Sequence, residues 1–240
     1  LTTALLVCLV AFLVDKPYAL TAAIFAGSYF AWNYGAAHYG APGIGDHHAW
    51  VSMLTLMMWA LISMGMHGAT LDRSRAAAGY GAAAGVIAGL LLGSWVASLI
   101  SILLIQLAFG VLLMLQRKRP RIGLASMGLA FHIGAFLTVL PAVLSSPWKE
   151  DFPWMVVNLS WFHLWELALG GLVFIPMLRK PEGGRIHPLG IPIGILAVIA
   201  ICMISKLGPG AGILEGVAWV SRANEFMSGI AESEPLWGSG

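Results

Sequence analysis

Long apolar runs separated by short charged or turn-rich breaks make up most of this chain. A run of about 20 apolar residues is long enough to cross a bilayer as an α-helix. We therefore predict an all-α fold, a polytopic integral membrane helix bundle with about seven or eight transmembrane helices. The predicted spans are residues 1–14, 18–37, 48–67, 77–93, 95–116, 122–145, 154–178 and 188–207.

Two of these spans come from one uncharged run, residues 77–116. As a single helix this run would be about 60 Å long, about twice the thickness of the hydrocarbon core. We therefore predict a tight hairpin near Gly93 and Ser94, which divides the run into two antiparallel helices.

Glycines recur at four-residue spacing in the first half of that run, at Gly81, Gly85 and Gly89. Small residues at this spacing let two helices approach closely inside a membrane. We expect this glycine face to pack against another helix.

The composition agrees with a membrane location. The chain is 59% hydrophobic and only 10% charged, whereas soluble domains are roughly 25% charged. This excludes a solvated globule and a disordered chain, and makes membrane lipid the expected surroundings. A net charge of only +2 gives no reason to expect nucleic-acid binding. Cys8 and Cys202 lie in apolar runs and are expected to be buried hydrophobic side chains.

The basic residues predict an orientation. With eight spans, ten of the thirteen Lys and Arg residues fall on one side of the membrane. These ten are Lys16, Arg73, Arg75, Arg117, Lys118, Arg119, Arg121, Arg179, Lys180 and Arg185. Loops rich in Lys and Arg face the cytoplasm. We therefore expect a multi-pass protein of the cell membrane with cytoplasmic basic loops.

The same scheme divides the chain into a transmembrane helical domain, residues 1–207, and a more polar C-terminal tail, residues 208–240. The tail is expected to be extracytoplasmic or interfacial. No small-residue cleavage site follows residues 1–14, so we do not expect that run to be a cleaved signal peptide.

Three ionisable residues interrupt the apolar runs at 122–145 and 154–178: His132, His163 and Glu166. A charged side chain at the centre of a span costs about 2.5–3.5 kcal/mol on insertion scales, and such residues often mark a functional path. The two spans should form an antiparallel pair, which puts His132 and Glu166 at similar depth near the membrane midplane. His163 and Glu166 share a helix face at i, i+3 spacing.

Three interpretations of these groups remain open. In the first, a structural membrane subunit, His132 hydrogen-bonds Glu166 or a carbonyl group and ties two helices together. In the second, His132 and His163 bind a cofactor, haem b or copper, and Glu166 is the catalytic residue or orients one ring. The chain would then be a subunit of a redox or metal-dependent membrane complex, such as a membrane oxidoreductase, with other membrane subunits as partners.

In the third interpretation, Glu166 is the titrating group of a small-solute or proton-coupled transporter or channel, and a histidine relays the proton. Two histidines beside one carboxylate favour the second interpretation over the third.

A second group of candidate ligands is His38, Asp46, His47 and His48. Histidine and carboxylate side chains suit zinc or copper(II). Asp46 is also a good N-cap for the following span, so a capped helix start with interfacial histidines is the alternative. In the predicted orientation this group lies on the extracytoplasmic side.

Overall fold

The computed structural model describes residues 2–14, 16–32, 48–70, 73–115, 122–178, 198–204 and 208–220. Every regular element in these ranges is a helix, so the all-α prediction is confirmed for them. The elements are α1 (Thr2–Leu13), α2 (Lys16–Trp32), α4 (His48–Thr70), α5 (Ser74–Ser94), η1 (Val96–Ser98), α6 (Leu99–Leu115), α7 (Ile122–Ser145), α8 (Trp148–Asp151), α9 (Trp161–Leu172), η2 (Ile175–Leu178) and α11 (Pro209–Val220). A short helix at Val198–Ile204 precedes α11.

Among the described residues, four helical segments are long and apolar enough to cross a membrane. They are Ala49–Ala69, Ser74–Ser94, Ile122–Ser145 and Trp161–Leu178. α1, α2 and α6 are apolar but shorter, and a spanning helix needs about 20 residues. A fifth span would result if two short helices, Val198–Ile204 and Pro209–Ala218, were counted together. The axes of these two helices are bent by 74° relative to each other. The predicted total of seven or eight spans is therefore not confirmed.

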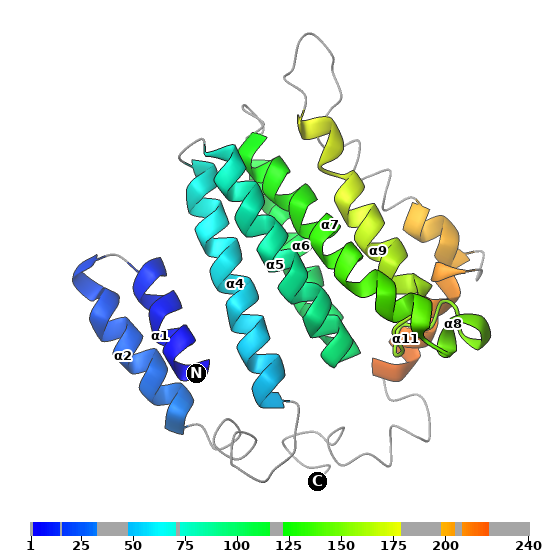
Figure 1. The fold of residues 1–240 in the computed structure, drawn as a ribbon, viewed down its shortest axis with the longest axis horizontal. Helices are drawn as coiled ribbons and strands as arrows, with labels where there is room; N and C mark the ends of the chain where they lie inside the picture. Colours follow the sequence, from blue (N-terminus) through cyan, green and yellow to red (C-terminus); the bar gives the residue numbers. More distant parts are fainter. Residues whose placement is uncertain are drawn as a thin grey trace.

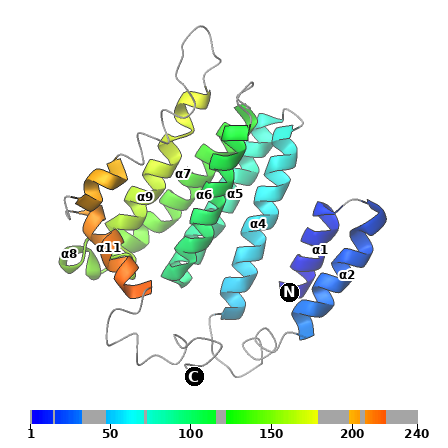
Figure 2. The same cartoon turned by 180° about the vertical axis from the view of Figure 1, so that it is seen from behind.

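The helices form a layer with one helix on its face. α4, α5, α7 and α9 run side by side in that order, each packed against the next (Figure 1). α6 lies against one face of this layer, behind it in Figure 1 and in front of it in Figure 2. The α1–α2 hairpin lies beside α4 at the edge of the layer.

The long uncharged run breaks where the sequence predicts. α5 ends at Ser94, and Trp95 is extended, with φ −157° and ψ 111°. The turn is held by the Trp50 indole, which donates a hydrogen bond to the Ser94 hydroxyl at 3.0 Å. α6 then begins after one turn of 3₁₀-helix.

The glycine face of α5 packs against α7, as expected. A Cβ atom on Gly85 would collide with the carbonyl oxygen of Phe131 and lie 2.9 Å from the amide nitrogen of Ala135. A Cβ on Gly81 would collide with the backbone of Met127 in the same way. The two helices therefore touch backbone to backbone, which fixes α7 and the side chains it carries.

The start of α9 differs from the prediction. The predicted span began at residue 154, whereas the helix begins at Trp161. Pro153 disfavours helical geometry in the residue before it, and Ser160 provides an N-cap whose hydroxyl also donates to the carbonyl of Met155 at 2.7 Å. Although the helix starts seven residues later, Glu166 lies about 8 Å along it, close to the middle of α9.

Candidate functional site

His132 is buried in the bundle, with 2% of its surface exposed. Its Nδ1 lies 2.7 Å from the carbonyl oxygen of Gly128, one turn earlier on α7. A carbonyl can only accept, so Nδ1 carries a hydrogen and the neutral ring keeps a lone pair on Nε2. That lone pair faces the side-chain nitrogen of Gln106 on α6, at 3.1 Å. The amide of Gln106 therefore donates to His132.

Gln106 connects His132 to Glu166. The same side chain also lies within bonding reach of the Glu166 carboxyl group on α9. Three helices thus contribute one polar side chain each to a single network. The structural interpretation of the sequence, in which His132 bonds Glu166 or a carbonyl group and ties two helices, did not include this third helix.

The carboxyl group of Glu166 is incompletely paired. Its Oε2 atom is buried and has no hydrogen-bond partner among the described residues. A buried polar atom without a partner costs about 1–3 kcal/mol, and more if it is charged. Such an atom needs an explanation, either through function or through a group that pairs with it in another state.

Glycines on α9 bring the network together. A Cβ on Gly170 would collide with Nε2 of His132 and lie 2.7 Å from the side-chain nitrogen of Gln106. A Cβ on Gly171 would lie 3.2 Å from that of His132. His132 therefore meets α9 one turn beyond Glu166, and the space that Gly170 leaves is filled by the histidine itself.

An aromatic cluster surrounds the other side of His132. The ring of Phe174 lies 5.5 Å from the imidazole, centroid to centroid, and fills the space beside Gly128. Phe109 of α6 packs edge-on against Phe174 at 5.4 Å and against Phe131 at 6.3 Å. These rings exclude water from the histidine and hold it in one orientation.

His163 is fully buried and takes part in the cap at the start of α9. The backbone N–H of Ser160 donates to its Nδ1 at 3.3 Å, which completes a capping box at the start of α9. The ring hydrogen of the neutral form is then on Nε2, which is buried and has no partner in the described part of the chain. To ligate a metal through Nε2, the ring would have to lose that hydrogen or release the cap.

The predicted ligands lie partly inside and partly outside the described residues. Among the described residues, no three His, Cys, Asp or Glu side chains are close enough to hold one metal ion. Of the second group, His38, Asp46 and His47 lie outside the described residues, and α4 begins at His48, whose side chain is likewise outside them.

Gln106 is the residue of this network that the sequence pattern did not single out. It is the only amide in α6, and no charged residue accompanies it in that helix. An isolated amide in an apolar span is a signal that could have identified it, because its side chain needs a buried partner.

Comparison with protein-family models, with curated proteins and with solved structures found no match to this chain.

Proposed function

We propose that this chain is a membrane transporter or channel in which Glu166 takes up and releases a proton as a proton or small solute crosses. The observation that carries the proposal is the buried, unpaired Oε2 of Glu166 beside an amide that also bonds His132. Ionisable groups in spanning helices that face the bundle interior are typical of proton paths. The network has the parts that a protonation switch needs.

Gln106 is the shared element of the proposed switch. When Glu166 is ionised, it accepts from the Gln106 amide, which strengthens that hydrogen bond. When Glu166 is protonated, its own hydroxyl becomes a donor, and the hydrogen bond that it accepts from Gln106 weakens. The Gln106 amide then bonds mainly to the lone pair of His132. The protonation state of Glu166 thereby biases the contact between α6, α7 and α9. If a second species crosses with the proton, we propose that it is a small solute.

Flux measurements test this function. Purified protein in proteoliposomes with an internal pH-sensitive dye is expected to dissipate an imposed pH gradient faster than empty liposomes do. A pH change that requires one added solute would identify a transporter. Faster dissipation of the pH gradient without any added solute would identify a proton channel. Liposomes with the protein that leak no faster than empty ones, under every solute tested, would contradict the proposal.

A second candidate, the redox or metal-dependent subunit, rests on the tautomer of His132. An Nδ1–H bonded to a backbone carbonyl, with the lone pair on Nε2, is the arrangement that orients histidine ligands of metals. Haem b or copper would require Gln106 and Gly170 to move away from Nε2, and a further ligand from another membrane subunit. This candidate predicts a Soret band or stoichiometric copper in purified protein. A spectrum without a Soret band, together with the absence of bound metal, would exclude this candidate function. The same result would exclude a metal site at His38, Asp46, His47 and His48.

The orientation of the chain is a further prediction. The helix ends that adjoin basic segments lie together at one end of the bundle (Figure 1). They are the ends of α4, α6 and η2 and the starts of α5 and α7. Lys149, in α8, lies at the other. This supports cytoplasmic basic loops, because such loops are retained inside.

In a background with Cys8 and Cys202 replaced by alanine, we expect Gly43→Cys to react with an impermeant maleimide added outside intact cells. Gly183→Cys is expected to react only after the cells are opened. The reverse pattern would invert the orientation and put the group His38, Asp46, His47 and His48 in the cytoplasm.

A further inference from the structure

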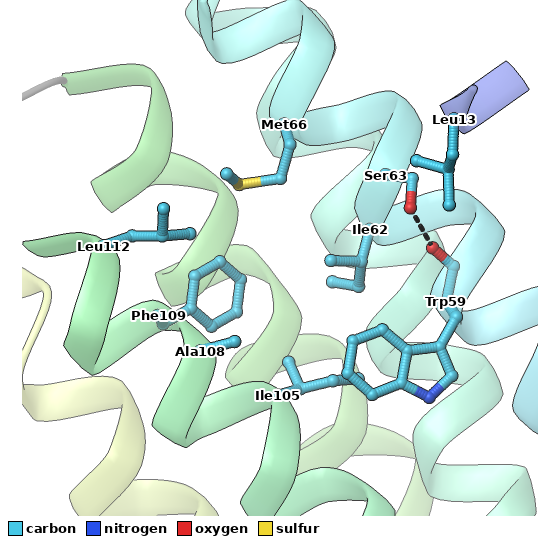
Figure 3. Close-up of a pocket in the computed structure, with 9 residues that line it drawn as sticks. All are labelled: Leu13, Trp59, Ile62, Ser63, Met66, Ile105, Ala108, Phe109 and Leu112. Atoms are coloured by element: carbon cyan, nitrogen blue, oxygen red, sulfur yellow. Dashed lines mark hydrogen bonds between the residues drawn. The ribbon is translucent and has the colours of Figure 1, made fainter. Parts of the chain in front are cut away.

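An apolar cavity of about 260 Å³ lies between α4 and α6 (Figure 3). α4 contributes Trp59, Ile62 and Met66, and α6 contributes Ile105, Phe109 and Leu112. Among the main helix contacts of the described chain, α4 packs against α1, α5 and α7, and α6 is not one of its neighbours. Because α6 lies on the face of the layer, the side chains of α4 and α6 face each other across a space that neither helix fills.

Two polar side-chain groups belong to the described lining of this cavity, the Ser63 hydroxyl and the Trp59 indole N–H. Its one hydroxyl, that of Ser63, already donates to the carbonyl oxygen of Trp59 at 2.8 Å (Figure 3). An engineered apolar cavity of about 150 Å³ stays dry and binds benzene or xenon. The larger cavity here offers water fewer partners than the two to four that a buried water needs, so an apolar ligand is the occupant that fits it.

The cavity is reached from the side of the bundle. Trp59, Met66 and Leu112 are only half-buried although they line it. Leu13 at the end of α1 stands at its edge and is 59% exposed. α4 is one of the four helical segments able to cross the membrane, so the medium beside this opening is hydrocarbon.

We propose that the cavity is a binding site for one lipid acyl chain, which enters between α4 and α6. A chain in the cavity restores van der Waals contacts that an empty space would forfeit, and it needs no polar partner there. This inference is independent of Glu166. The proposed acyl-chain site and the Glu166 network share only Phe109, which lines the cavity and belongs to the aromatic cluster around His132.

The test uses lipid-depleted protein in detergent, titrated with phosphatidylcholine that carries a photoreactive diazirine in one acyl chain. Illumination is expected to label peptides of α4 and α6 that contain Trp59 and Leu112. Unlabelled phosphatidylcholine should compete for this labelling with saturation. Labelling that is equally strong on the exposed face of α6, at Ile100 and Leu107, and does not saturate would overturn the proposal, because it would mean general lipid contact only.

Two matched variants sharpen the result. Ala108 lines the cavity, and Ala108→Phe should fill it and lower the saturable labelling about tenfold, because several methylene contacts are lost. Gly110 has no atom within 4 Å of the place of its Cβ, so Gly110→Phe adds the same ring to open space on α6 and should leave the labelling unchanged.

Equal saturable labelling in Ala108→Phe and Gly110→Phe would contradict an acyl-chain site in this cavity. If Ala108→Phe does not fold, the saturation of labelling in the unmodified protein still decides the matter. Crosslinks between two copies of the chain at α4 and α6, in place of lipid adducts, would show that a second copy covers the cavity and would also overturn the proposal.

Discussion

Glu166→Gln is expected to reduce proton flux in proteoliposomes roughly a hundredfold, the lower end of what a positioned proton-transfer group contributes. The amide has nearly the same shape as the carboxyl group and can still bond Gln106, but it cannot bind and release a proton near neutral pH. The fold should therefore survive while the proposed function is lost. The measurement is the initial rate of pH change inside the vesicles at a fixed gradient.

Glu150→Gln is the matched control. Glu150 is an exposed residue of α8, outside the four segments able to span the membrane, and the same chemical change there should leave the flux unaltered. Glu166→Asp keeps an ionisable group at the site and should retain part of the flux. Flux that is the same in Glu166→Gln and in the unmodified protein would remove Glu166 from the transport path. Equal thermal stability of the two proteins would show that the fold is intact.

Gly85→Ala is expected to lower the free energy of unfolding by about 1–3 kcal/mol, the usual effect of overpacking. The added Cβ would collide with the carbonyl oxygen of Phe131 and lie 2.8 Å from its carbonyl carbon. Both atoms belong to the backbone of α7, which cannot rotate away as a side chain can. Relief would require α5 and α7 to separate, and this would displace His132, the next residue of α7 after Phe131. Unfolding in mixed micelles at increasing SDS fraction, followed by tryptophan fluorescence, gives the difference.

Gly79→Ala provides the comparison on the same helix. Gly79 is exposed and has nothing within 4 Å of the place of its Cβ. The substitution there should be neutral or stabilising by up to about 1 kcal/mol, because alanine favours the helix over glycine. If the two variants were equally stable, close backbone contact between α5 and α7 would not be what holds these helices together.

Part of the candidate site was predictable because ionisable residues are conspicuous in apolar runs. His132 and Glu166 stand out by their chemistry alone, and both take part in the buried network. Gln106 carries no charge, so it did not stand out, although the position of α6 on the face of the layer makes it the link between them. The role of His163 was missed because a histidine at the third position of a helix closes a capping box only if the helix begins at Trp161.

The sequence by itself determined the class of the fold, the division of residues 77–116 near Gly93 and Ser94, and the glycine face of α5. These features depend on local properties, namely apolar length, helical periodicity and the size of side chains. Only the tertiary structure decided the start of α9 and the contact of His132 with Gly170. These depend on which helices are neighbours. Neighbours are chosen by close packing between residues far apart in the sequence, and a pattern of apolar positions does not specify that packing.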